Sequence, residues 1–327
     1  MFKVLGSLVL AVGSLFTLTN TNKSVVNVEA GYAGRDAESY YAGISNSLTG
    51  DQLKNALHKL NGDMRKSTCG YDGMKTQAPY TDADPNGSGR IVSFYSRTLV
   101  GPQWDRAETW NREHVWPDSH GGGKVDNDAH MVRPCSTKDN GSRGNDFYAT
   151  DVYDPGELGY PNYRGIASRI IFYCAIADTS LSILDANTGG SSQMGKLSDM
   201  LKWNLEYLPS KDANADLELK VEQSRNEYIA NTLQGNRNPF IDHPSYACKI
   251  WGNANADAKK YCDQYNGWTD GDDCGRSRCR AVRGSRDVFH ATCGRGECHG
   301  GCSRTAGRRA HASAGSRSCQ APCCPNR

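Results

Sequence analysis

After residue 18 the sequence has no apolar run long enough to cross a membrane, which excludes a protein with later transmembrane spans. Net charge is also nearly absent, since the 327 residues carry a formal charge of only +2. A chain with this balance cannot attract polyanions through its overall charge, so any such binding needs a local basic patch. No internal repeat is visible, and the length suits one large domain or two small ones.

The N-terminus has the pattern of a signal peptide. Met-Phe-Lys precedes an apolar run from Val4 to Leu18, and polar residues then lead to an A-x-A-like site at Val28-Glu29-Ala30. The run is short for a membrane span, and an uncleaved anchor is the alternative interpretation. We therefore predict a signal peptide over residues 1–30 and a soluble mature protein outside the cytoplasm, either secreted or, in a Gram-negative source, periplasmic.

The C-terminal part differs in composition from the rest. From residue 270 onward lysine is absent, while eleven Arg and five acidic residues give a net charge of +6 and leave −4 for the remainder. Eight of the thirteen cysteines lie between Cys274 and Cys324, and cysteine usage of this kind fits an oxidising compartment. We therefore separate a globular domain over residues 31–266 from an Arg/Gly/Cys-rich tail over 267–327.

Three interpretations of the tail stay open. It is a disordered basic segment that adds affinity for nucleic acid or an anionic surface, or the product of a shifted reading frame, which would explain the switch from Lys to Arg. The third is a small zinc module, although its spacing matches no standard site; its ligands would be Cys293, Cys298, His299 and Cys302. The first two are favoured, and we assign the tail no function.

Periodicity predicts an α+β fold in which helices dominate. Leu53, Leu57 and Leu60 form an apolar stripe behind a cap at Thr49 or Asp51. Further helices are predicted over 164–177, 196–208 and 217–233, the first of them largely buried. Alternation predicts strands over 91–100 and 109–116, hence a small sheet within residues 91–132.

Two stretches concentrate residues suited to phosphodiester chemistry. In the first, residues 110–117 (WNREHVWP), Glu113 offers a hard oxygen ligand for a divalent cation and His114 an imidazole that can take a proton from water. Neighbours on a strand point to opposite faces, so we expect the strand to end or bend there, as Pro117 favours. A bare Glu-His pair is more often a polar strand edge.

The second stretch, residues 128–148, reads as a polar, Gly-rich loop that runs into a short helix. Possible oxygen ligands there are Asp139, Asn140, Asn145 and Asp146. Composition alone favours an ordinary surface loop. The order and spacing of the two stretches together favour a functional site.

Four segments together resemble the bacterial endonuclease I family, whose members belong to the His-Me finger, or ββα-metal, group. They are NREHVWPDSHGG from Asn111, DAHMVRPCSTKDNGSRGN from Asp128, RGIASRIIFY from Arg164 and QGNRNPFIDHP from Gln234. The resemblance spans roughly residues 40–262. It implies a mostly helical α+β domain around a His-Me (ββα-metal) finger with a small antiparallel sheet.

The resemblance also implies a one-metal mechanism. His114 matches the general base, Glu113 the acidic metal ligand, and Asn145 the asparagine on the finger's helix that completes the metal site. The implied ion is Mg²⁺, with Ca²⁺ or Mn²⁺ as alternatives. Hydrolysis would leave 5′-phosphate ends, and a helix N-terminus near Asn145 would help hold the phosphate.

The phosphate-binding residues are less determined. Better-known family members carry a longer insert with a phosphate-stabilising arginine, where this sequence has only Gly121-Gly122-Gly123-Lys124 and a few polar residues. A structural ion pair or a solvated charge is the alternative role for each basic candidate. These candidates are Arg133, Lys138, Arg143, Arg164 and Arg169.

Other notable residues have plainer interpretations. We expect His130 to brace the finger, His120 to pack a loop and His243 to lie in a turn. Cys248 and Cys262 flank a short segment near the end of the resemblance and are predicted to form a disulfide, whereas Cys174 lies on an apolar helix and is predicted to be a buried thiol. Aromatics able to stack on bases are more often core residues; those considered are Trp104, Trp110 and Trp116.

The resemblance thus implies an endonuclease that binds DNA and also RNA, with little sequence preference because such nucleases read the backbone, and we expect it to be a monomer. Two alternatives use fewer of the motif residues. A secreted protein that binds nucleic acid without cutting it would depend on the tail and be insensitive to chelators. A hydrolase of another phosphodiester, such as a lipid headgroup, lacks an obvious apolar lid.

Overall fold

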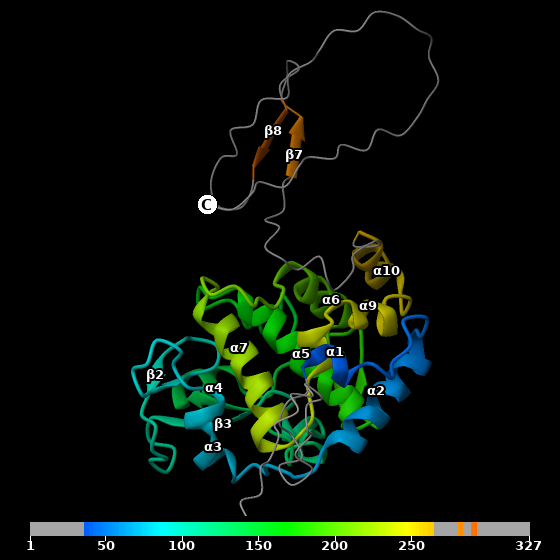
Figure 1. Ribbon diagram of the computed structural model, residues 1–327. Coiled ribbons are helices and arrows are strands. Elements are labelled where there is room, and N and C mark those ends of the chain that lie inside the picture. Colours follow the sequence, from blue (N-terminus) through cyan, green and yellow to red (C-terminus); the bar gives the residue numbers. More distant parts are fainter. Residues whose placement is uncertain (1–35, 265–279, 284–288, 293–327) are drawn as a thin grey trace, which may run out of the picture. The chain divides into compact units, whose positions relative to one another are not determined.

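A computed structural model describes residues 36–264, 280–283 and 289–292 (Figure 1). The predicted signal peptide and the four proposed zinc ligands of the tail lie outside these residues. The chain divides into two units, Met1–Cys274 and Gly275–Arg327, and each is described by itself. Within the described ranges, no helix is both long enough and apolar enough to span a bilayer.

Helices are the main regular secondary structure among the described residues of the first unit. They are α1 (Ala37–Tyr40), α2 (Gly50–Met64), α3 (Met74–Thr81), α4 (Thr137–Arg143), α5 (Asn162–Ala177), α6 (Leu197–Glu206), α7 (Leu217–Tyr228), α8 (Pro239–Asp242), α9 (Ser245–Trp251) and α10 (Ala256–Asp263). Two 3₁₀ turns, η1 (Asp118–His120) and η2 (Gly122–Lys124), and a π-helical turn, η3 (Ile229–Leu233), complete them.

Helix α5 forms the centre of this unit (Figure 1). Every residue from Gly165 to Ile176 is buried, because α5 packs against α2, α6, α7 and α8. A helix that is buried on all sides needs apolar residues around its whole circumference, and the sequence of α5 supplies them. The four helices predicted from periodicity are confirmed, with bounds that differ by a few residues and with α7 continuing into η3.

The strands are short and form separate pairs. Antiparallel pairs join β1 (Ile91–Val92) to β2 (Leu99–Val100) and β3 (Trp110–His114) to β4 (Val132–Ser136). A third pair, β5 (Ser182–Ile183) with β6 (Gln193–Met194), is parallel. The unit is therefore α+β with small sheets, as predicted, although one of them is parallel.

The single strand predicted over 91–100 is wrong. This segment folds back on itself, so that Ile91 pairs with Val100. Between the strands, Tyr95 and Arg97 have left-handed backbone conformations with φ of 71° and 56°. Such values reverse the chain direction but are uncommon outside glycine, and apolar alternation does not reveal them.

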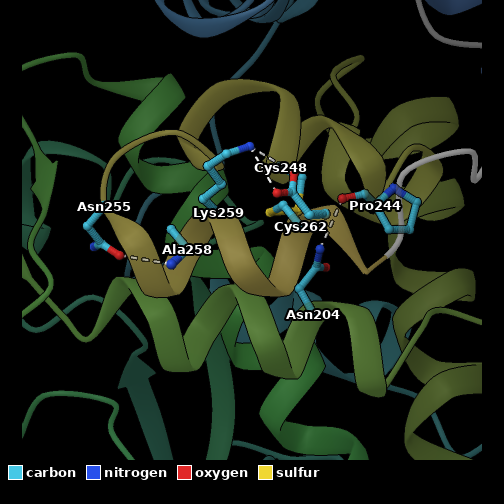
Figure 2. The surroundings of a disulfide bond; sticks show 8 residues. Asn204, Pro244, Cys248, Asn255, Ala258, Lys259 and Cys262 are labelled. Carbon is cyan, nitrogen blue, oxygen red and sulfur yellow. Dashed lines mark hydrogen bonds and ion pairs between the residues drawn. A yellow bond between two sulfur atoms is a disulfide. The ribbon is translucent and has the colours of Figure 1, made fainter.

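The predicted disulfide between Cys248 and Cys262 is present and joins α9 to α10 (Figure 2). The Asn255 side chain caps α10 by accepting a hydrogen bond from the Ala258 backbone, and Asn204 of α6 donates to the Pro244 carbonyl before α9. The bridge and these two bonds hold α9 and α10 in place. Cys174 is a buried free thiol, as predicted.

In the second unit the described residues form one antiparallel hairpin. Strand β7 (Arg280–Arg283) pairs with β8 (Phe289–Thr292), with Arg280 opposite Thr292 and Arg283 opposite Phe289.

Candidate active site

The two motif stretches become neighbouring strands followed by a helix. His114 at the end of β3 lies opposite Val132 at the start of β4. Ser136 then caps α4, because its Oγ accepts a hydrogen bond from the Asp139 backbone at 3.1 Å and donates one to the Asp139 carboxylate at 2.7 Å. Strand β3 ends at His114, three residues before Pro117, as the sequence predicts.

Glu113 lies on the buried face of β3. Only 2% of the residue is exposed, and its Oε1 accepts a hydrogen bond from the Tyr95 hydroxyl at 2.8 Å and lies 3.4 Å from Arg143 Nε. Burial raises the pKa of Glu113 to about 7, although Arg143 and the Tyr95 hydrogen bond act in the opposite direction. Both contacts use Oε1, so Oε2 is the oxygen through which this carboxylate can bind a cation.

Two tyrosines around Glu113 were not predicted from the sequence. Tyr95, in the turn between β1 and β2, shares a 2.5 Å hydrogen bond between hydroxyls with Tyr148, and both rings are buried. The left-handed backbone of Tyr95 is the kind of strain that clusters at functional sites. Tyr148 is the last residue of the second stretch, where no pattern singles it out, and Tyr95 lies in a turn 18 residues before Glu113.

His114 lies on the opposite face of β3, and 18% of its side chain is exposed. Its ring stacks on Tyr71 with centroids 4.4 Å apart, and its Nε2 lies 3.8 Å from an Asp126 carboxylate oxygen. Burial lowers the pKa of His114, while Asp126 and Asp118 partly oppose that effect. The imidazole is therefore neutral at neutral pH and able to accept a proton.

Arg112 shares the His114 face of β3. Its guanidinium lies 3.6 Å from the centre of the Tyr71 ring and 4.9 Å from that of Trp104, and it pairs with Asp72 at 2.5 Å. Trp104 is half-buried, whereas Trp110 and Trp116 are fully buried, as expected for core residues. The histidine face is thus lined by aromatic rings and one cation.

The two asparagines of the second stretch occupy different positions. Helix α4 ends at Arg143, so Asn145 lies two residues beyond its C-terminus, on an exposed loop. The helix N-terminus predicted near Asn145 is therefore wrong. Asn140 lies within α4 and donates a 2.5 Å hydrogen bond to Asn111 of β3, which is two residues from Glu113 and on the same face.

The basic candidates fall into two groups. Arg133, Arg143 and Arg169 are buried, and each has a protein partner: the carboxylates of Asp82 at 2.9 Å, Glu113 at 3.4 Å and Glu222 at 2.7 Å, respectively. A phosphate would have to displace these partners, so the arrangement matches the structural ion pair that the sequence left open. Arg164 is partly exposed beside Asp154, and Lys138 is exposed on α4.

In the segment between η2 and β4, the buried carboxylate of Asp128 organises a polar network. It accepts hydrogen bonds from Tyr173 at 2.5 Å, Gln234 at 3.0 Å, Asn236 at 3.0 Å and Arg65 at 3.2 Å. His130 is buried beside it, with its Nε2 3.1 Å from the Asn236 carbonyl, and burial lowers the pKa of this histidine to about 4. A neutral, enclosed imidazole of this kind braces the loop, as the sequence predicts.

The other two histidines lie in packing positions. His120 packs against Phe147, and its carbonyl accepts a 2.6 Å hydrogen bond from Trp116. His243 follows α8 and stacks on Tyr246.

Comparison with known proteins defines the class. Residues 49–159, which include β3, β4 and α4, match the family described as Endonuclease I. The chain is 30% identical over 267 residues to the extracellular ribonuclease of Bacillus amyloliquefaciens, covering 73% of this chain and 85% of that protein. It is 32% identical over 248 residues to the extracellular ribonuclease of Bacillus subtilis (strain 168), covering 66% and 79%.

The chain therefore belongs to the endonuclease I family of nucleases. No solved structure matches it.

Proposed function

We propose that the protein is a secreted, metal-dependent endonuclease that hydrolyses DNA and RNA with little sequence preference. The observation that carries this proposal is the pairing of Glu113 and His114 at the end of β3. Glu113 is a buried carboxylate whose two contacts both use Oε1, and His114 is a half-buried, neutral imidazole. The order β3, β4, α4 around them supports the ββα-metal finger that the resemblance implies.

His114 acts as the general base and takes a proton from the water that attacks phosphorus. The bond between phosphorus and the 3′ oxygen then breaks, this oxygen takes up a proton from solvent, and the products carry a 5′-phosphate and a 3′-hydroxyl. The same product ends are expected for DNA and RNA, because the 2′-hydroxyl takes no part in this reaction.

The donor set near Glu113 suits a hard cation such as Mg²⁺. Among the described residues, no group of three or more His, Cys, Asp or Glu side chains is placed to hold a metal. Glu113 Oε2 would therefore act with one amide oxygen, from Asn145 or from Asn140, and Mg²⁺ habitually completes such a set with water. When bound, the ion neutralises charge that develops on the phosphate and on the leaving oxygen.

Substrate and location follow from the relatives and the sequence. The names of both relatives support RNA as a substrate and an extracellular location. The N-terminal pattern over residues 1–30 supports export independently. Lys138 and Arg164 are the candidate cations for phosphate contacts, since both have exposed surface.

The test is to incubate the purified secreted protein with supercoiled plasmid and, separately, with a structured RNA, in Mg²⁺ or in EDTA. We expect cleavage of both substrates in Mg²⁺, none in EDTA, and none by His114→Ala. His58→Ala is the matched control, because His58 is an exposed histidine of α2. Binding without cleavage by the folded wild type would instead favour a nucleic-acid-binding protein.

A further inference from the structure

Tyr71 occupies the space between two side chains of the histidine face. Its ring stacks on His114 at an interplanar angle of 25° and also lies under the Arg112 guanidinium. Residues two apart on a strand are separated by about 6.6 Å, which is close to the thickness that one interposed aromatic ring fills. Tyr71 thus determines the plane in which the imidazole of His114 lies.

Hydrogen bonds hold Tyr71 at its hydroxyl and at its backbone carbonyl. Its hydroxyl donates a hydrogen bond to the Arg112 carbonyl at 3.2 Å, and its own carbonyl accepts one from Arg112 Nη1 at 3.1 Å. Tyr71 belongs to the turn between α2 and α3, which Cys69 and Met74 anchor in the core. The ring is therefore a rigid wall for the imidazole.

Asp126 lies at the edge of the same imidazole. Its Oδ2 is 3.8 Å from His114 Nε2, and this nitrogen is buried with no hydrogen-bond partner. A carboxylate near one ring nitrogen favours the tautomer that carries its hydrogen there. Nδ1 then becomes the nitrogen with the free lone pair.

We propose that Tyr71 and Asp126 are positioning residues for His114: Tyr71 sets the plane of the imidazole, and Asp126 keeps its hydrogen on Nε2 so that Nδ1 receives the proton from water. The inference rests on the proposed nuclease function. Neither residue needs to touch the substrate. Their effect is to hold the base in one orientation and one tautomer before the nucleic acid binds.

Three variants test the positioning of the base on RNA and plasmid substrates. Tyr71→Leu removes the ring, Tyr71→Phe keeps the ring without the hydroxyl, and Asp126→Asn removes the charge. We expect Tyr71→Leu and Asp126→Asn each to lower kcat by about 10- to 100-fold with KM unchanged, because misplacing a catalytic group affects the chemical step. Tyr71→Phe should restore kcat to within about 3-fold of the wild type, because it restores the ring that orients the base.

A matched control separates positioning from folding. Tyr80 of α3 stacks on Tyr228 with centroids 6.0 Å apart, so Tyr80→Leu removes a similar pair of rings on another part of the surface. We expect Tyr80→Leu to keep the wild-type kcat. The thermal midpoints of all variants are measured alongside, and equal kcat losses in Tyr71→Leu and Tyr80→Leu would overturn the inference.

A spectroscopic measurement tests the tautomer independently of activity. In ¹⁵N-histidine NMR spectra of the metal-free protein, assigned through His114→Ala, we expect the Nε2–H tautomer of His114 and a loss of that preference in Asp126→Asn. An Nδ1–H tautomer in the wild type would overturn the inference. If the wild type does not cleave at all, the proposed function fails and the spectra alone decide whether the imidazole is held as described. If His114→Ala is inactive while Tyr71→Leu and Asp126→Asn retain wild-type kcat, only the positioning inference fails.

Discussion

The two faces of strand β3 give neighbouring residues opposite environments. Glu113 is 2% exposed and contacts Tyr95 and Arg143, whereas 18% of the His114 side chain is exposed beside Tyr71. The alternation of a strand makes this possible, because consecutive side chains point in opposite directions. Glu113 is thus enclosed in the interior while His114 remains accessible, as the proposed metal ligand and the proposed general base each require.

The largest expected effect compares the two residues directly. We expect His114→Ala and Glu113→Ala each to lower kcat by about 10²- to 10⁴-fold, the usual range for a lost general base. Only Glu113→Ala should also lower the free energy of unfolding, by about 3–5 kcal/mol, because it leaves the buried Arg143 without its carboxylate. Urea denaturation followed by circular dichroism measures the difference. Equal stability of the two variants would contradict the contrast between the faces.

The second prediction compares the loss of stability when one arginine is removed from each face, Arg143 beside Glu113 and Arg112 beside His114. Arg143→Met should lower the free energy of unfolding by about 3–5 kcal/mol, since it strands a buried carboxylate. Arg112→Met should lower it by about 1 kcal/mol or less, because the partner, Asp72, is 81% exposed and water screens the pair. Paired denaturation curves check this order, and a reversal would show that the histidine face is the more enclosed one.

Mg²⁺ binding should stabilise the protein only when the Glu113 carboxylate is present. At a Mg²⁺ concentration about 100 times the dissociation constant, binding to the folded state adds about 2.7 kcal/mol of stability. We expect the thermal midpoint of the wild type and of His114→Ala to rise with Mg²⁺, and that of Glu113→Gln to stay constant. Differential scanning fluorimetry over a Mg²⁺ titration measures this. A rise in Glu113→Gln that equals the wild-type rise would place the ion elsewhere.

The smallest expected effect concerns the approach of the nucleic acid. Lys138 is exposed on α4, close in sequence to both candidate amide ligands. Lys138→Gln should weaken substrate binding a few-fold at low salt and reduce the salt-dependence slope by about one, as loss of one phosphate contact does. Fluorescence anisotropy with inactive His114→Ala as the background measures affinity. An unchanged slope would remove Lys138 from the binding surface.

Local patterns predicted the elements that depend on neighbouring residues. The strand that carries Glu113 and His114, the buried helix α5 and the disulfide between Cys248 and Cys262 are all present. Each depends on periodicity, on a turn residue or on a short separation between cysteines. The segment 91–100 was mistaken for one strand, because left-handed backbone at Tyr95 and Arg97 leaves no trace in apolar alternation.

The contacts that complete the site are long-range, and the sequence did not reveal them. Tyr71 reaches His114 from 43 positions earlier in the chain, and Tyr95, which donates to Glu113, is hydrogen-bonded to Tyr148 from 53 positions later. The partners of the buried arginines are also long-range contacts that the sequence does not reveal. The sequence shows a cation near a phosphate site, but only the fold shows that Arg133 and Arg169 are enclosed with carboxylates.

The network around Asp128 has a consequence for the order in which the protein folds. Strands β3 and β4 are close in sequence and can pair early, but Gln234 and Asn236, which hold Asp128, follow it by 106 and 108 residues. Contacts between such distant residues form slowly, because a long loop must close first. Because a chain is synthesised from its N-terminus, His114 emerges well before residues 234–236, so the loop that carries Asp128 is held in place only after that later segment has joined it.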